Sequence, residues 1–435
     1  MSALAIGGIA FLVLTLLIYA GLHISTALLL VSFVGIWFIR DNIGAAMRIS
    51  GIAASDAISD YEFGVIPLFV LMGFLVMVSG VGKESYLLAH RACRRIPGGL
   101  GHATVFGNAI FSAITGVTVA ALVLFTKLAV PEMIERGYDK RFAVGVVAGS
   151  AMLGMLIPPS VLMILYAILT DESIGKLFLA GIVPGLLLTA AFSVAIAWLA
   201  IRKPEQYGGR HVLNEREIAS AREVVRMAMP IVFLIVVVLG GMYAGFFTAT
   251  EAGATGATAA LALALWRRSL NWSTFWKILV DSGHVTGSLI LMIIAANVFS
   301  RFLAMSGLPD AMGQRVQSMG LGLYGALGIY ILVLLLLGTA MDSASTVLIA
   351  VPVFAVIFKA FNADLIWIGI ITMITVEVGL ITPPLGMAPF VIKMTLDRPD
   401  ITLDDIYAGA LPFALAALAV VGLIVAFPKI ATGIL

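Results

Sequence analysis

Charged residues are scarce in this sequence. Only 11% of its 435 residues are Asp, Glu, Lys or Arg, whereas 61% are apolar and the mean hydropathy is +1.10. Soluble domains contain about 25% charged and about 45–50% apolar residues, so this chain has too little polar material to face water on all sides. The composition excludes a secreted enzyme, a single-pass receptor and a nucleic-acid-binding protein, and it predicts an integral membrane protein.

Cysteine and histidine are also sparse. The single cysteine, Cys93, cannot form an internal disulfide, and His23, His102 and His284 lack a metal-site spacing such as His-x-x-x-His. Since the sequence also lacks a recognisable nucleophile–base pair, we expect no enzymatic activity. No Lys or Arg precedes Arg40, so the basic leader of a signal peptide is missing, and we interpret the first apolar run as a permanent span.

Long apolar runs are plentiful. A spanning helix needs about 20 apolar residues, and ten runs without strong charge predict ten crossings. They lie at about 3–21, 24–39, 63–81, 142–169, 177–201, 228–246, 252–266, 284–305, 365–392 and 406–428.

Two further apolar stretches, at about 101–130 and 321–361, are interrupted by small and polar residues. The first interruption, at 112–118, leaves arms of roughly 11 to 14 residues, too short for a bilayer that needs about 20. The second, at 338–346, leaves longer arms, so two full spans stay possible there. We predict a re-entrant hairpin in each stretch.

The sequence carries a weak internal repeat. Four motifs recur in the same order about 225 residues later: Tyr19-Ala20-Gly21 at 243–245, Ser79-Gly80 at 306–307, the Pro158-Pro159 region at 383–384, and Ala180-Gly181 at 408–409. We predict two repeats, 1–205 and 227–435, joined by a cytoplasmic linker at 206–226. Each repeat has five transmembrane helices and one re-entrant hairpin. An odd number of crossings inverts the second copy, as in many secondary transporters.

Basic residues gather on one side of the predicted connections, the linker included. The positive-inside rule makes that side cytoplasmic and places both termini on the outer side. The first hairpin then enters from the cytoplasm and the second from the opposite side. The mixed apolar and basic segment 83–95 predicts a helix at the cytoplasmic lipid interface.

Paired prolines predict a broken helix at mid-membrane in each repeat, at 154–160 and 379–386. Proline lacks an N–H and frees the carbonyl four residues earlier, which here affects Gly154, Met155, Gly379 and Leu380. Unpaired carbonyls are costly in hydrocarbon, so such breaks persist where protein, water or an ion satisfies them. Two matching breaks favour paired cation sites.

The hairpin tips supply further oxygen atoms. We predict two Na⁺ sites. The first comprises Ser112, Thr115, Gly116, Gly154, Met155 and Pro158, and the second comprises Gly338, Thr339, Met341, Asp342, Gly379 and Thr382. A carboxylate within a membrane segment is costly and usually functional, so Asp342 is a candidate cation ligand, although it could equally cap the helix after the tip. Glu377 could bind the coupling ion or hydrogen-bond frayed backbone.

Helices that begin after each tip and each proline pair would point their amino ends at one region. Their free N–H groups and dipoles favour an anion, so we expect a carboxylate substrate held near the cations. The predicted substrate-binding residues are Thr115, Gly116, Thr118, Ser160, Ser343, Ser345, Pro384 and Gly386. Arg301 should pair with a carboxylate or face an aqueous cavity.

Several motifs resemble the large membrane (M) subunit of tripartite ATP-independent periplasmic (TRAP) transporters, which are DctM-like proteins of the ion transporter superfamily. The resemblance covers essentially the whole chain. It rests on Ile66-Pro67-Leu68-Phe69, the tip at 113–116, the run 154–185, Thr250-Glu251-Ala252-Gly253-Ala254, Met341-Asp342 and the string 377–386 (EVGLITPPLG). The sequence departs from the family's usual residues at Val117-Thr118, Ser343 and Ala388.

The resemblance implies a Na⁺-coupled importer of organic acids in the bacterial inner membrane, working by an elevator movement of its hairpin-bearing domain. It also implies two separate partner chains: a small four-helix (Q-type) membrane subunit and a periplasmic substrate-binding (P-type) protein. The alternative within transport is proton coupling through Asp342 and Glu377.

Overall fold

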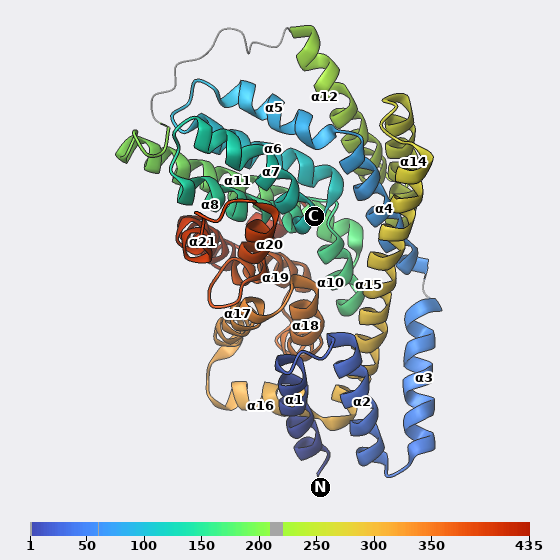
Figure 1. The fold of residues 1–435 in the computed structure, drawn as a ribbon. Coiled ribbons are helices and arrows are strands. Elements are labelled where there is room, and N and C mark those ends of the chain that lie inside the picture. Colours follow the sequence, from blue (N-terminus) through green and yellow to red (C-terminus); the bar gives the residue numbers. More distant parts are fainter. Residues whose placement is uncertain (1, 60, 209–220) are drawn as a thin grey trace.

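The computed structural model describes residues 2–59, 61–208 and 221–435, and the regular structure in these ranges is entirely helical (Figure 1). The predicted all-α class is therefore confirmed. The predicted linker falls largely on residues 209–220, which lie outside the described ranges. Its last residues, 221–226, already belong to a helix.

The first half contains the helices up to α11. Their bounds are α1 Ala3–Tyr19, α2 Ile24–Arg40, α3 Ile43–Ser59, α4 Val65–Val78, α5 Val81–Cys93, α6 Gly99–Thr115, α7 Thr118–Glu135, α8 Lys140–Ala151, α9 Leu153–Leu156, α10 Val161–Thr170 and α11 Ile174–Arg202. Helices α6 and α7 meet at the predicted tip, and their re-entry from the cytoplasm stays a prediction. The chain is helical up to Leu156, so the break before α10 spans 157–160 and is shorter than the predicted 154–160.

The second half follows the same order of elements. Its helices are α12 Ala221–Ile235, α13 Gly241–Tyr243, α14 Ala249–Trp266, α15 Trp272–Ser306, α16 Leu308–Ser318, α17 Gly322–Ala340, α18 Ser343–Ala360, α19 Leu365–Leu380, α20 Met387–Thr395, α21 Leu403–Ala426 and α22 Lys429–Thr432. Here α17 and α18 form the pair predicted as a hairpin, and each is long and apolar enough to cross a membrane singly, so the alternative of two full spans stays open. The break separates α19 from α20. In Figure 1, α5 and α16, which precede the two hairpins, lie at opposite ends of the molecule. Inverted copies would have this arrangement, and the inversion across the membrane stays a prediction.

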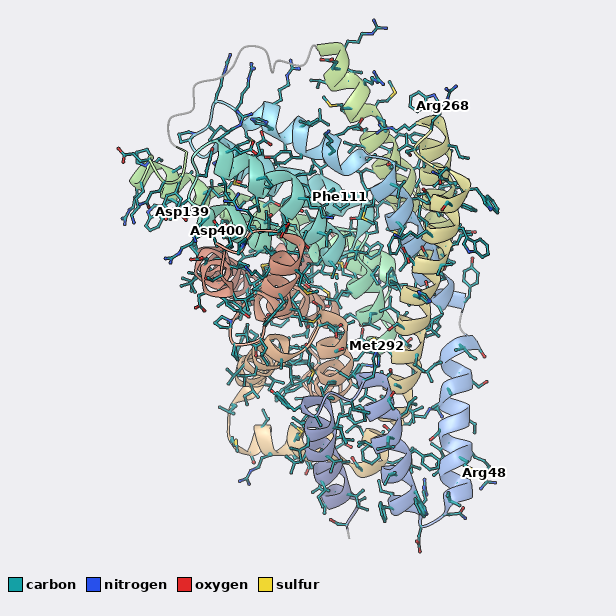
Figure 2. All side chains as sticks on the ribbon, viewed as in Figure 1. Arg48, Phe111, Asp139, Arg268, Met292 and Asp400 are labelled. Carbon is teal, nitrogen blue, oxygen red and sulfur yellow. The ribbon has the colours of Figure 1, made fainter. Side chains whose placement is uncertain are left out.

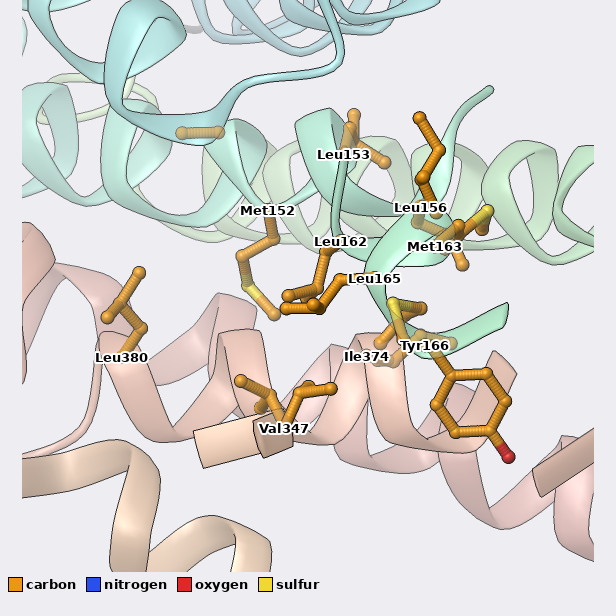
Figure 3. Packing of buried hydrophobic residues seen from close by; sticks show 14 of the residues in the cluster. Met152, Leu153, Leu156, Leu162, Met163, Leu165, Tyr166, Val347, Ile374 and Leu380 are labelled. Carbon is orange, nitrogen blue, oxygen red and sulfur yellow. The ribbon is translucent and has the colours of Figure 1, made fainter. Parts of the chain in front are cut away.

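The helices form two packed groups. In one group α2 packs on α15 and α4 packs on α14, and these helices run roughly vertically in Figure 1. In the other group the hairpins pack against the broken helices, α11 packs on α6, and α21 packs on α8, α11 and α19. Figure 3 shows the apolar contact between the halves within this second group, where Leu162 and Leu165 of α10 face Val347 of α18 and Ile374 of α19.

Six described helices are long and apolar enough to cross a membrane singly, and two bent pairs could each supply another span. One bent pair is α4 with α5, at 65°, and the other is the broken helix of the first half, at 45°. The predicted ten crossings also include shorter apolar helices such as α1, α2 and α19. Charged side chains such as Arg48, Asp139, Arg268 and Asp400 lie at the periphery in Figure 2, as a membrane protein requires.

Two helices were not anticipated from the sequence, and one expectation about helix length was wrong. Helices α3 and α16 were not expected, because charged residues interrupt their apolar pattern. The arms of the first hairpin are 17 and 18 residues long, not 11 to 14. Helical bonding continues past the apolar core of each arm, and α7 runs through Pro131 to Glu135.

Helices α8 and α21 approach each other very closely. A Cβ at Gly145 would lie 2.0 Å from the carbonyl oxygen of Gly409, and a Cβ at Gly409 would lie 1.9 Å from that of Arg141. Asp405 supports the same contact, since it accepts from Arg141 Nε at 2.7 Å and pairs with Lys140 Nζ at 3.2 Å. Only glycine fits at this crossing, because the backbones touch.

We expect Gly409→Ala to lower the free energy of unfolding by about 1–3 kcal/mol, since added volume in a tight contact forces backbone shifts. Thermal unfolding of the detergent-purified protein measures it. Gly422→Ala is the matched control on α21, because nothing lies within 4 Å of its new Cβ and alanine favours a helix by about 1 kcal/mol over glycine. Equal melting temperatures for the two variants would contradict the packing argument.

Candidate functional site

The first hairpin tip lies directly against the first helix break. Gly116 at the tip has φ +64°, which suits glycine, and a Cβ there would lie 2.2 Å from the carbonyl oxygen of Pro159. The Val161 N–H donates to the Gly116 carbonyl at 3.3 Å. Gly154 in turn packs on the backbone of Thr118, with its virtual Cβ at 3.2 Å. Tip and break therefore form one compact unit.

The residues predicted for the first Na⁺ site gather in this unit. Ser112, Thr115 and Pro158 are buried, and the Ser112 hydroxyl is buried without a hydrogen-bond partner among the described residues. Such an orphan oxygen suits a cation. The Met155 carbonyl was expected to be free, but the hydroxyl of Ser160 donates to it at 2.8 Å.

The second tip approaches the second break through two glycines. A Cβ at Gly338 would lie 3.0 Å from the Cα of Gly379. The Gly379 carbonyl, also expected to be free, accepts the N–H of Thr382 at 3.0 Å. The hydroxyls of Thr382 and Thr339 donate to carbonyls of their own helices, and Met341 is buried. Each paired carbonyl keeps a second lone pair, so the predicted ligand sets remain possible.

Asp342 immediately precedes α18 and caps it. Its carboxylate accepts the Ser345 N–H at 3.3 Å and also the Ser345 hydroxyl. The capping interpretation of Asp342 is thus confirmed. The carboxylate forms no ion pair with the residues that the structure describes, so a role as cation ligand stays open beside the cap.

Glu377 connects the two hairpins. It is 1% exposed on α19, and one carboxylate oxygen accepts the Thr118 hydroxyl at 3.2 Å while the other accepts the Ser343 hydroxyl at 2.6 Å. Thr118 is the first residue of α7 and Ser343 the first of α18. Neither alternative considered for Glu377 from sequence anticipated this bridge, and its partners lie 259 and 34 residues away.

A cavity of about 250 Å³ lies between the two hairpin tips. The residues that begin α7, α10, α18 and α20 line it, so four helix amino ends converge there as expected. Val70 of α4 and Val285 and Leu289 of α15 close the opposite wall. Aligned amino ends favour an anion, so the geometry suits a carboxylate.

Only two of the eight predicted substrate-binding residues line this cavity. Thr118 and Ser343 line it, whereas Thr115, Gly116, Ser160, Ser345, Pro384 and Gly386 lie outside its lining. Pro384 and Gly386 offer their carbonyls to the Tyr407 hydroxyl at 3.2 and 3.5 Å. Arg301 pairs with Asp56 and is likewise outside the lining. The apolar wall residues were not predicted, because isolated valines and leucines carry no signal in an apolar chain.

Comparison with known proteins agrees with the family resemblance of the sequence motifs. Residues 11–430 match the family described as "Tripartite ATP-independent periplasmic transporter, DctM component". The chain is 34% identical to the C4-dicarboxylate TRAP transporter large permease protein DctM of Pseudomonas aeruginosa, over 85% of each chain. It is 28% identical to the sialic acid TRAP transporter large permease protein SiaM of Vibrio cholerae, over 95% of this chain and 94% of that one.

Two solved structures share the fold. The MtrF structure of Neisseria gonorrhoeae superposes with a TM-score of 0.57 at 13% identity, covering 87% of this chain and 84% of that one. The YdaH transporter of Alcanivorax borkumensis gives 0.55 at 15% identity, covering 89% and 90%. At these identities the likeness concerns the fold alone.

Proposed function

The chain belongs to the DctM component family of tripartite ATP-independent periplasmic transporters, and on this premise we propose that it imports a small organic acid together with Na⁺. Its relatives are large permease subunits and not enzymes. The printed names of those relatives include C4-dicarboxylate, sialic acid and 2,3-diketo-L-gulonate permeases. A small carboxylate is therefore the substrate class we assign here.

The observation that carries the proposal is the convergence of four helix amino ends on one cavity. Each amino end contributes a partial positive charge and N–H groups that lack partners within the helix. A carboxylate in the cavity would accept these N–H groups without needing a basic side chain. We place the substrate there, between the two hairpin tips.

Na⁺ is the second cargo in this proposal. The first ion would be held by the oxygens of Ser112, Thr115, Gly116, Gly154, Met155 and Pro158, and the second by those of Gly338, Thr339, Met341, Asp342, Gly379 and Thr382. The unpartnered Ser112 hydroxyl supports the first site, and the unpaired Asp342 carboxylate beside the cavity supports the second. Bound cations would offset the charge of the incoming carboxylate.

An elevator movement is consistent with where the cavity lies. Its polar side belongs to the hairpins and broken helices, whereas α4 and α15 contribute only apolar side chains, Val70, Val285 and Leu289. An apolar boundary without directional bonds can slide at low cost, so we propose that the hairpin-bearing group moves against α4 and α15.

The proposed assembly has three chains. A small four-helix membrane subunit and a periplasmic binding protein would complete the transporter, with this chain in the bacterial inner membrane and both termini on the periplasmic side. The binding protein would deliver the acid to the cavity from that side.

Uptake by the reconstituted assembly tests the proposal. We expect accumulation of a labelled acid in liposomes only when the binding protein is present and Na⁺ is higher outside. A sodium-free preparation with an imposed pH gradient is the control. Uptake that follows the pH gradient and ignores Na⁺ would replace our proposal with the proton-coupled alternative.

A further inference from the structure

The lining of the cavity also indicates what kind of acid fits. We propose that the transported anion has a single carboxylate on an apolar body, and is neither a dicarboxylate nor a polyhydroxylated acid. This inference rests on the proposed function, because it takes the cavity between the tips to be the substrate site.

The walls of the cavity are almost entirely apolar. Only three polar side chains reach the lining, namely Thr118, Asp342 and Ser343, and no Arg, Lys or His does so in the described ranges. The other lining residues are valines, leucines, alanines and methionines, among them Val70, Val285 and Leu289. A ligand body in contact with these walls should itself be apolar.

None of the three polar side chains has a proton to offer the substrate. The hydroxyls of Thr118 and Ser343 both donate to Glu377, and a hydroxyl has only one proton. The carboxylate of Asp342 can only accept when ionised. Hydrogen-bond donors for an anion must therefore come from the backbone N–H groups at the helix amino ends.

These amino ends are not equivalent. Ser160 caps α10 and Asp342 caps α18 with their side chains, and the first N–H of α10 is bonded to Gly116. Helices α7 and α20 have no side-chain cap, because their N-cap residues are Val117 and Gly386, and the two helices pack on each other. The lining thus offers one uncapped donor region, which suits one carboxylate.

A second polar group on the ligand would lose its water without gaining a donor. An unmet hydroxyl, at about 1–3 kcal/mol, should weaken binding by about 5- to 150-fold, and a second charge should weaken it by more. Each methylene that replaces it should strengthen binding by about fourfold until the space is filled. The volume of about 250 Å³ lies below the roughly 300–1,000 Å³ of drug-sized sites, so the body should be small, of about three to five carbons.

Direct binding to the purified complex of this chain with its small membrane subunit tests the inference without the selectivity of the binding protein. Calorimetry in Na⁺ buffer would compare butanoate, pentanoate and 4-methylpentanoate with butanedioate and 2,3,4-trihydroxybutanoate. We expect pentanoate to bind at least tenfold more tightly than either polar acid. Equal or tighter binding of butanedioate or the trihydroxy acid would overturn the inference and leave Na⁺-coupled transport intact.

A matched pair of variants tests whether the acid binds in this cavity. Val285→Thr adds a hydroxyl to the cavity wall at nearly constant volume, and Val280→Thr makes the same change on α15 at a position outside the lining. We expect the first variant to weaken pentanoate binding at least threefold and the second to leave it unchanged. Equal responses of the two variants would place the acid elsewhere. If no acid binds with Na⁺ and the complete transporter takes up none, the proposed function itself fails.

Discussion

Replacing Glu377 by leucine is expected to reduce uptake at least a hundredfold. The substitution removes the acceptor of two buried hydroxyls, Thr118 at 3.2 Å and Ser343 at 2.6 Å, which are the first residues of the helices after the two tips. An unsatisfied buried hydroxyl costs roughly 1–3 kcal/mol. Because the two tips would lose their common anchor, the helix amino ends should no longer face one cavity. Uptake in proteoliposomes measures the loss, and thermal unfolding shows whether the variant folds.

Glu377→Gln is the control for this prediction. Glutamine keeps the shape and one carbonyl acceptor, and its amide can donate to the other hydroxyl, which is able to turn its own proton away. If Glu377 acts as a bridge, this variant should keep uptake within about tenfold of the parent. A glutamine variant as inactive as the leucine variant would mean that the charge matters, which favours an ion or proton role for Glu377.

The ends of the helices around the site could be predicted from the sequence, because they depend on the chemistry of neighbouring residues. The helix ends at both tips and both breaks follow from residues that act on their own backbone. Pro158 and Pro383 lack an N–H, Gly116 takes a left-handed conformation at φ +64°, and Asp342 caps the helix that follows it. Such effects need no tertiary partner, so the amino ends of α7, α10, α18 and α20 could be placed from sequence.

Contacts between segments that are far apart in the sequence could not be predicted in this way. Helix α3 was missed because Arg48 and Asp56 interrupt its apolar pattern, yet Asp56 is paired with Arg301, 245 residues away. The bridge from Thr118 to Glu377 spans 259 residues. An apolar wall residue such as Val285 has the same character as one that faces lipid. Only the packing of α15 against α18 and α4 makes it part of the site.

The charge of Asp342 should set the response of the transporter to Na⁺. Its carboxylate lines the cavity and forms no ion pair with the described residues, although an isolated charge in a membrane segment is costly. We expect Asp342→Asn to weaken the apparent Na⁺ affinity of uptake at least tenfold. Asparagine caps a helix about as well as aspartate, so α18 should begin at the same residue and the charge alone should change.

Binding of Na⁺ gives a readout that does not depend on transport. A ligand that binds the folded state stabilises it by RT ln(1 + [L]/Kd), so a tenfold weaker site loses about 1.4 kcal/mol of Na⁺-induced stabilisation at high salt. The Asp342→Asn variant should therefore melt at or above the parent without Na⁺, because the isolated charge is gone, and it should gain less stability than the parent when Na⁺ is added. Ser345→Ala, which removes a partner of the cap and keeps the charge, should instead lower both melting temperatures equally. If the asparagine variant follows the parent at every Na⁺ concentration, Asp342 only caps α18 and the second cation site loses its charged ligand.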